Sequence, residues 1–300
     1  MTIAVTGANS SVGVNLLSHL SDRGDANILA IVRSERASES LVSSSNLTPK
    51  IVPYEDVGQL AGVIERASCL VHLAGVLIEN KTSTYKKANV DTAAAIVDAA
   101  RSSDLKRIVL VSVIGADSGS PNPYFRSKGN AEQLVMGSGI ASTIIRTPIL
   151  LGKNTAGAAG LIRVAKQRKI RLLGGGRYKM RPLDLDDLSR AIVSAINSPP
   201  EVSTVYELVG PEVIRYRDLV LRTAHMMGRN PSIGTMPVWM ARAGAFIRSN
   251  ISQGGVTPAV IDVITMDERV QINANIDLDI PLTPLSVTLE KLLDDCDQAL

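Results

Sequence analysis

The sequence predicts an α/β fold built on a doubly wound parallel sheet, followed by a smaller, mostly helical lobe. Apolar runs of strand length alternate with segments of helical periodicity through the first half of the 300 residues, which is the pattern of successive βαβ units. A glycine-containing turn, Thr6–Gly13, joins the first of these runs to the first helical segment. After Gly152 the alternation loosens, and this change of pattern indicates a second lobe.

Strands and helices can be assigned in order along the first half of the chain. A strand that is buried on both faces of a parallel sheet is apolar along its whole length. The runs expected to be strands are Thr2–Thr6, Asn27–Val32, Lys50–Pro53, Cys69–Leu73, Arg107–Ser112 and Ser142–Arg146. Apolar residues at three- and four-residue spacing predict the helices Val12–Asp22, Val57–Arg66, Lys87–Ser102 and Pro123–Met136. Residues 1–152 are therefore expected to form the sheet domain.

The second half predicts a lobe of helices joined by short strands and turns. Residues 153–183 and 211–300 are expected to form it, with 184–210 returning to the sheet domain. Asp184, Asp186 and Asp187 precede an apolar helix, where carboxylates favour the positive end of the helix dipole. The further helices expected are Ala156–Gln167, Tyr216–Met227, Val238–Arg248, Pro258–Asp267 and Ser286–Ala299.

Composition excludes several classes of function. Lys plus Arg (32) nearly balance Asp plus Glu (29), so the net charge of +3 gives no strong attraction to nucleic acid, and a small-molecule partner is expected. Cys69 and Cys296 lie far apart without a Cys/His cluster, which argues against a disulfide framework and against a metal site. We find neither a secretory signal nor an apolar run of the roughly 18 to 20 residues that a membrane helix needs. A cytoplasmic protein without a membrane span is expected.

The turn after the first strand is expected to hold the pyrophosphate of a dinucleotide. Where a strand of a Rossmann sheet passes into a helix, backbone N–H groups and the helix dipole can meet a phosphate. The central glycine of the usual pattern is replaced by Ser10 or Ser11, whose hydroxyl can still donate a hydrogen bond to phosphate. A plain strand-to-helix turn is the alternative. The cofactor contacts expected here are Gly7, Asn9, Ser10, Ser11, Val12 and Gly13.

Arg33 at the end of the second strand indicates which nicotinamide cofactor is bound. An acidic residue at this place binds the ribose 2′-hydroxyl of NAD, whereas a basic residue accommodates the 2′-phosphate of NADP. The nearest acid, Glu35, comes two residues later. NADP(H) is therefore favoured over NAD(H), the alternative being that Arg33 is a solvated loop cation.

A catalytic group is expected at the end of the fifth strand. Ser112 ends that strand, and Tyr124 and Lys128 follow on the next helix, one turn apart and on one face. Carbonyl reduction needs a proton donor, and a free tyrosine has a pKa near ~10, so a lysine cation is expected to lower it. Tyr124 would be the general acid/base, Lys128 would hold the nicotinamide ribose, and Ser112 would orient the substrate oxygen. The alternative is that Tyr124 and Lys128 are ordinary helix residues, with the cofactor bound but no chemistry done.

These segments together resemble the extended and atypical short-chain dehydrogenase/reductase superfamily, over about residues 1–225. Val111–Asp117 followed by Tyr124–Lys128 is most similar to bacterial NAD(P)H-binding proteins that resemble the accessory nucleotide-binding subunit of respiratory complex I. The resemblance implies that Leu73, Ala74 and Gly75 pass beneath the cofactor and that Thr147 and Pro148 approach the nicotinamide. Dehydratases of this group have an Asp-Glu pair after the serine or threonine, whereas this chain has Val113 and Ile114, which disfavours dehydration.

Three functions follow from these patterns. The first is an NADP(H)-dependent oxidoreductase acting on a carbonyl or hydroxyl substrate, based on the catalytic group and Arg33. The second is a sugar-nucleotide epimerase, in which Arg177, Arg181 and Lys169–Arg171 would meet a nucleotide diphosphate. The third is a non-catalytic NAD(P)H-binding subunit or redox sensor.

Two expectations concern association with other molecules. Apolar residues in Met236–Ile247 could dock on a protein or a membrane surface. More often such a stretch is the core face of a helix, and this second interpretation is favoured. A homodimer is possible.

Overall fold

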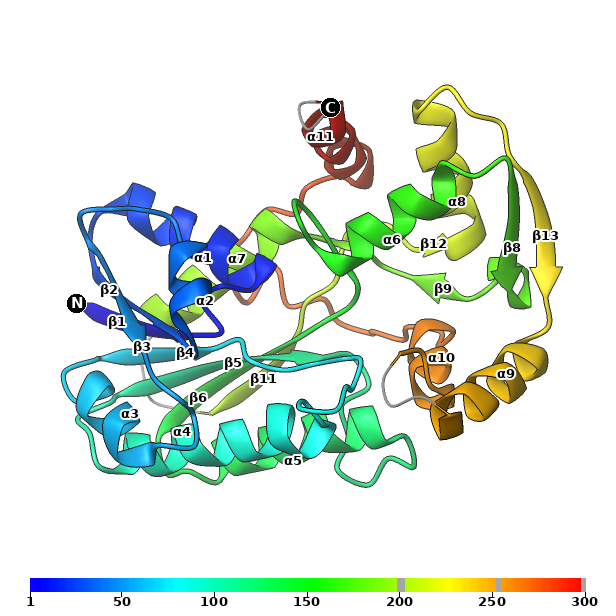
Figure 1. Cartoon of the computed structure of the whole chain (residues 1–300). Helices are drawn as coiled ribbons and strands as arrows, with labels where there is room; N and C mark the ends of the chain where they lie inside the picture. Colours follow the sequence, from blue (N-terminus) through cyan, green and yellow to red (C-terminus); the bar gives the residue numbers. More distant parts are fainter. Residues whose placement is uncertain (199–202, 252–254, 298–300) are drawn as a thin grey trace.

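The computed structural model describes residues 1–198, 203–251 and 255–297. Its first lobe is a seven-stranded sheet, entirely parallel, with the order β11-β6-β5-β4-β1-β2-β3 (Figure 1). The order reverses between β1 and β4, so the crevice expected to hold a ligand lies at the carboxyl ends of these strands. The strands are β1 (Thr2–Thr6), β2 (Asn27–Val32), β3 (Leu47–Ile51), β4 (Cys69–His72), β5 (Arg107–Val113), β6 (Ala141–Thr147) and β11 (Thr204–Glu207).

Six of these strands were predicted, with small differences at their ends, and the doubly wound parallel sheet is confirmed. The largest difference is β3, which begins at Leu47 rather than Lys50 and includes Pro49 at the edge of the sheet. An edge strand tolerates proline because one side of its backbone needs no partner. The seventh strand, β11, was not predicted, since four half-exposed residues give too short an apolar signal.

Helices cover both faces of the sheet (Figure 1). On one face lie α1 (Ser11–Arg23) and α7 (Leu185–Asn197), which pack on each other and on strand residues such as Val5 and Val71. The other face is covered by α3 (Val57–Ile64), α4 (Thr92–Arg101) and α5 (Pro123–Met136). Each strand therefore buries alternate residues under both helical layers, which is why its sequence is continuously apolar. A short helix, α2 (Glu35–Glu39), follows β2, and a π-helical segment (Lys86–Asp91) precedes α4.

The second lobe has a separate core, formed by residues such as Leu161, Leu172, Leu219 and Leu289. It is mostly helical, as predicted, but it also contains three small two-stranded sheets. Its helices are α6 (Ala156–Ala165), α8 (Tyr216–Met226), α9 (Val238–Ile251), α10 (Pro258–Ile264) and α11 (Leu285–Asp297). The strand pairs are β7 (Leu150–Leu151) with β10 (Leu183–Asp184), β8 (Lys169–Leu173) with β13 (Ser232–Met236), and β9 (Lys179–Met180) with β12 (Ile214–Arg215).

The structure corrects the favoured interpretation of Met236–Ile247 as the core face of a helix. In α9 the side chains of Trp239, Met240, Phe246 and Ile247 are between 51% and 71% exposed. The side that packs inward carries small residues instead, including Ala245, which is buried. Since α9 lies at the margin of the lobe, against α10, its larger apolar residues point outward.

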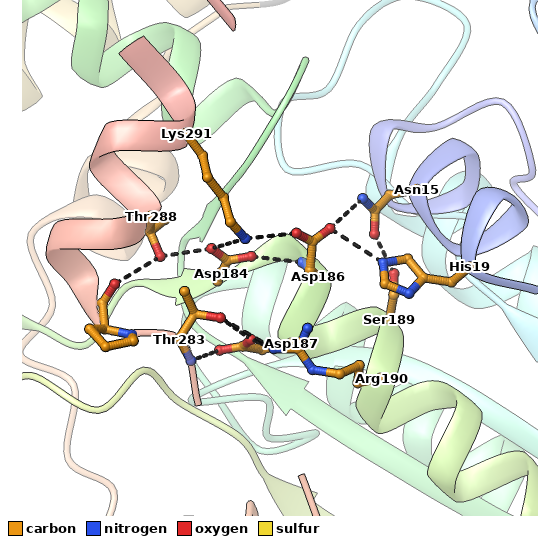
Figure 2. A network of polar contacts seen from close by, with 11 residues as sticks. Asn15, His19, Asp184, Asp186, Asp187, Ser189, Arg190, Thr283, Thr288 and Lys291 are labelled. Atoms are coloured by element: carbon orange, nitrogen blue, oxygen red, sulfur yellow. Dashed lines mark hydrogen bonds and ion pairs between the residues drawn. The ribbon is translucent and has the colours of Figure 1, made fainter. Parts of the chain in front are cut away.

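A network of buried and half-buried polar groups joins the two lobes (Figure 2). Asp184 caps α7 by accepting from the Asp186 backbone N–H, and its other oxygen accepts from Thr288 and Lys291 of α11. Asp186 accepts from Asn15 of α1 and from Lys291, and it pairs with His19. Its pKa lies well below its usual range, chiefly because of the hydrogen bond with His19. The three acids therefore do more than favour a helix dipole, because they tie α7 to α1 and α11.

The third carboxylate of this network, Asp187, is fully buried. It accepts from the Thr283 backbone N–H at 2.8 Å and from the Thr283 hydroxyl at 2.6 Å, and it pairs with Arg190. Burial raises the pKa of Asp187, while the Thr283 hydrogen bonds oppose that change. The segment that leads into α11 is thus held on the helix that covers the sheet.

Candidate active site

The turn between β1 and α1 has the close packing that a phosphate turn requires. Gly7 has a φ of +71°, and a Cβ on it would lie 2.8 Å from the Ala74 backbone nitrogen. A Cβ on Gly13 would lie 2.5 Å from the carbonyl oxygen of Ala8, so the start of α1 can approach β1 only with glycine at this place. The geometry of this turn leaves no room for a side chain at positions 7 and 13, and the chain has glycine at both.

The serine in place of the central glycine begins the helix. Ser10 adopts an extended conformation at the N-cap of α1, and its hydroxyl oxygen accepts from the Gly13 N–H at 3.0 Å. Asn9 is exposed, while Ser11 and Val12 are half-buried. The first turn of α1 contains no acidic residue, so its positive end is free of a competing carboxylate. This arrangement presents helix N–H groups to an anion at the carboxyl end of β1.

Tyr54, which sequence reasoning missed, lies beside this turn. Its hydroxyl oxygen accepts a hydrogen bond from the Gly7 N–H at 2.7 Å, and its ring is almost completely buried. The guanidinium of the exposed Arg33 lies 5.9 Å from the centre of this ring, within the range of a cation–π contact. The sequence signal was a lone aromatic residue after the third strand, and only the pairing of strands brings it to Gly7.

The carboxyl ends of β1, β4 and β5 place three polar side chains on the face covered by α4 and α5. Thr6 and His72 are joined by a 2.7 Å contact between the hydroxyl and Nδ1. Burial lowers the pKa of His72 to about 3, so its ring is neutral. Among the described residues, neither His72 Nε2 nor the Ser112 hydroxyl has a hydrogen-bond partner, although both atoms are buried. Buried polar atoms are rarely left in this condition, so these strand ends are candidates for a ligand site.

Lys128 projects from α5 onto the same strand ends. Its ammonium donates to the Val111 carbonyl at 3.0 Å, and it lies 3.8 Å from the point where a Cβ of Gly75 would stand. Burial lowers the pKa of Lys128 to about 8. The segment Leu73–Gly75 therefore connects the phosphate turn, through the contact of Ala74 with Gly7, to the lysine.

Tyr124 lies near these groups in a small apolar cluster. Its ring centre is 5.6 Å from that of Tyr85 and 5.7 Å from that of Phe125, and the cluster includes Val76 and Val113 from the loop after β4 and the end of β5. Burial raises the pKa of Tyr124, with a further contribution from Tyr85. The expected lowering by Lys128 is wrong for this arrangement, because the lysine is bonded to a backbone carbonyl and desolvation dominates.

Of the remaining predicted residues, Thr147 is the last residue of β6 and Pro148 comes directly after it. The Thr147 hydroxyl donates to the Ser112 carbonyl at 3.3 Å, which places it at the same end of the sheet. A further group that sequence reasoning missed, Glu268, accepts from the Arg181 N–H at 2.6 Å, and burial raises its pKa to about 7. The structure thus gathers the phosphate turn, Leu73–Gly75, Ser112, Lys128 and Thr147 along one edge of the sheet.

Metal-binding clusters and membrane-spanning helices are both absent from the described part of the chain. Within it, no group of three or more His, Cys, Asp or Glu side chains is arranged to hold a metal ion. None of its helices is both long enough and apolar enough to cross a membrane. Cys69 is buried in β4, and the side chain of Cys296 falls outside the described residues.

The sequence is similar to that of a known protein family and to several characterised proteins. Residues 7–199 match the model of the NAD(P)H-binding family. The chain is 26% identical to the mitochondrial NADH dehydrogenase (ubiquinone) 1 alpha subcomplex subunit 9 of Arabidopsis thaliana, over 93% of this chain and 73% of that protein. It is 24% identical to a ceramide reductase of Caulobacter vibrioides, over 78% of this chain and 73% of that protein.

Solved structures agree on the architecture. MoeE5 in complex with UDP-glucose and NAD has a TM-score of 0.77 and 17% identity, covering 100% of this chain and 99% of that chain. At that identity the likeness concerns the fold alone. The family match covers more than half of the chain, and the sheet order agrees with it. The protein therefore belongs to the NAD(P)H-binding family.

Proposed function

We propose that the protein is an NADP(H)-dependent oxidoreductase that acts on a carbonyl or hydroxyl substrate. The observation that carries this proposal is the position of Ser112 and Lys128, both buried at the carboxyl ends of the strands, with Tyr124 in the adjoining cluster. Relatives of the chain include a ceramide reductase, which supports reductase chemistry in a protein of this length. The unpartnered hydroxyl of Ser112 has a hydrogen bond to give to a substrate oxygen.

The cofactor preference rests on Arg33 and Tyr54. Arg33 follows the second strand, where the 2′-position of the adenosine ribose is recognised, and its guanidinium lies over the Tyr54 ring. A guanidinium held in this way is suited to a phosphate, because its planar donors match phosphate oxygens. The Tyr54 hydroxyl also accepts a hydrogen bond from the Gly7 N–H. The same side chain therefore contacts both the phosphate turn and Arg33.

The residues would divide the chemistry as follows. When bound, the nicotinamide supplies or accepts the hydride. Tyr124, whose raised pKa keeps it protonated at neutral pH, would donate its phenolic proton to the carbonyl oxygen during reduction. The Lys128 ammonium would hold the ribose hydroxyls and stabilise the phenolate left by that transfer. Ser112 would orient the substrate oxygen.

A second candidate is a non-catalytic NAD(P)H-binding subunit. Two observations favour it: the similarity to a complex I subunit over most of the chain, and the position of Tyr124, whose hydroxyl forms no hydrogen bond with any described residue. In this case the same strand ends would hold a nucleotide for structural reasons. The epimerase alternative is weaker, because the only acid near Arg33 comes two residues later.

Identification of the retained nucleotide and turnover assays would test the proposal. The purified protein should bind NADPH more tightly than NADH and oxidise it with some member of a panel of aldehydes, ketones and quinones. Tyr124→Phe should lower kcat by roughly 10²- to 10⁴-fold with little change in NADPH affinity, as for removal of a general acid. Tyr85→Phe is the matched control, since it removes the neighbouring phenolic hydroxyl, which donates to the Leu77 carbonyl.

Each alternative has its own result. Tight NADPH binding without turnover on the whole panel, and no effect of Tyr124→Phe, would favour the non-catalytic subunit. Tightly retained NAD would contradict the role of Arg33 and favour an epimerase.

A further inference from the structure

The second lobe carries two short segments of the same chemical pattern that lie against each other. Arg177-Tyr178-Lys179 leads into β9, and Arg215-Tyr216-Arg217 spans the end of β12 and the start of α8 (Figure 1). The two strands are antiparallel, with Arg215 directly opposite Lys179 and Ile214 opposite Met180. We define the cationic ribbon as Arg177, Lys179, Arg215 and Arg217.

Alternation along the ribbon separates charge from rings. Met180 and Ile214 are buried in the core of the lobe, whereas Lys179 and Arg215 are exposed. Tyr178 and Tyr216 stack on each other, with ring centres 5.4 Å apart and planes 14° apart, and they pack against the same core. The Tyr216 N–H donates to the Tyr178 carbonyl at 3.1 Å, which fixes the start of α8 against β9. The four cations thus extend from two paired segments whose tyrosines pack on the core of the lobe.

The four cations line one cavity of about 480 Å³, together with a single carboxylate, Asp218. None of the four forms an ion pair with any residue that the structure describes. The neighbouring Arg222 differs, because it is paired with Glu212 at 2.6 Å. Asp267 accepts from the Lys179 backbone N–H and not from its ammonium.

This arrangement costs stability without an anion. Like charges directly opposite each other on paired strands repel, and here the pair Lys179 and Arg215 is flanked by two further arginines. The N-terminus of α8, which has no side-chain cap, adds its positive end at the same place. Arginine is well suited to phosphate, because its planar donors bind two phosphate oxygens at once.

We propose that the cationic ribbon is a binding site for a ligand with two phosphate groups, recognised through the phosphates and not through a nucleobase. Charge supports two phosphates, since four cations face one carboxylate. The absence of base recognition follows from the tyrosines, because both rings of the two segments are stacked on each other and turned to the core. The site does not depend on hydride transfer, and its test requires no activity.

Calorimetric titration with inorganic pyrophosphate would test this site. Wild-type protein should bind pyrophosphate, with an affinity that falls as salt is raised. The double variant Lys179→Gln/Arg215→Gln should bind at least about tenfold more weakly, because each charge-assisted contact to phosphate is strong. The matched control is Lys166→Gln/Arg168→Gln, which removes two exposed cations between α6 and β8 in the same lobe and should bind like the wild type.

The melting temperature of the variant and the affinity for UDP are two further measurements that distinguish the possible outcomes. The melting temperature of Lys179→Gln/Arg215→Gln without ligand should equal or exceed that of the wild type, because the variant relieves repulsion, so weaker binding cannot be attributed to unfolding. UDP should bind no more tightly than pyrophosphate. Equal binding of pyrophosphate by the wild type and both variants would place it at the turn after β1 and overturn the proposal. If UDP bound much more tightly than pyrophosphate, the proposal that the site does not recognise a nucleobase would be wrong.

Discussion

At the junction of α1, α7 and α11, the carboxylates Asp184, Asp186 and Asp187 each accept hydrogen bonds from at least two donors. At the ends of β4 and β5, by contrast, two buried polar atoms have no hydrogen-bond partner in the part of the chain that the structure describes. On the helices of the junction, two other buried atoms lack a hydrogen-bond partner among the described residues: Arg190 Nε of α7 and the Ser21 hydroxyl oxygen of α1. Satisfied polar groups hold parts of a fold together, while an unpaired one costs about 1 to 3 kcal/mol. The contrast separates the part of the molecule arranged for stability from the part arranged for a ligand.

Asp187→Ala should give the largest effect on stability. The substitution leaves the Thr283 N–H without its acceptor and removes the fully buried carboxylate that pairs with Arg190. Removing one partner of a buried charged network costs about 3 kcal/mol or more, and chemical denaturation would measure it. Asp262→Ala is the control, since its ion pair with Arg242 is half-exposed at 3.5 Å and should contribute no more than about 1 kcal/mol. Equal losses in the two variants would contradict the structural role of the junction.

Lys128→Met should raise the free energy of unfolding, whereas Asp187→Ala lowers it. Burial lowers the pKa of Lys128 from 10.5 to about 8, so the folded state disfavours its charge. At about 1.4 kcal/mol per pKa unit, the variant should gain roughly 3 kcal/mol of stability while it loses activity. The penalty is fully present below pH 8 and disappears as pH rises toward 10.5, because the unfolded lysine then loses its proton too.

The pH dependence distinguishes this explanation from a change in packing. The difference in unfolding free energy between Lys128→Met and the wild type should therefore shrink between pH 8 and pH 10.5. Lys86→Met, at an exposed pair with Asp91, should show no such trend. A loss of stability in Lys128→Met at neutral pH would mean that the bond to the Val111 carbonyl outweighs desolvation.

A pair of serine substitutions should give the smallest effects and the sharpest comparison. Ser112→Ala removes a buried hydroxyl that has no partner among the described residues, and it should raise stability by about 1 kcal/mol, with reduced turnover. Ser142→Ala, on the neighbouring strand, removes a hydroxyl that donates to the Ile140 carbonyl at 2.8 Å and should lower stability by about 1 kcal/mol. Thermal unfolding of both proteins would measure the difference, and the same sign in both would remove the distinction between the two clusters.

Much of the fold could be predicted from local sequence patterns. The strands β1, β2, β4, β5 and β6 and the helix α5 follow from continuous apolar runs and from three- and four-residue spacing, and both signals depend only on neighbours along the chain. The edge strand β11 was not predicted, and the exposed apolar face of α9 was expected to be buried. A four-residue strand is too short for a pattern, and an apolar helical face looks the same in sequence whether or not another element covers it.

For the candidate site, the sequence by itself determined the residue types and their order: the two glycines of the turn, Arg33, Ser112, and Tyr124 one helical turn before Lys128. Only the tertiary structure decided what those groups experience. It placed the Tyr54 hydroxyl on the Gly7 N–H and left the Ser112 hydroxyl and His72 Nε2 without partners among the described residues. It also raised the pKa of Tyr124, where the residue spacing had suggested a lowering. The reason is that a pKa depends on burial and on the direction of neighbouring dipoles, which are set by chain segments far apart in sequence.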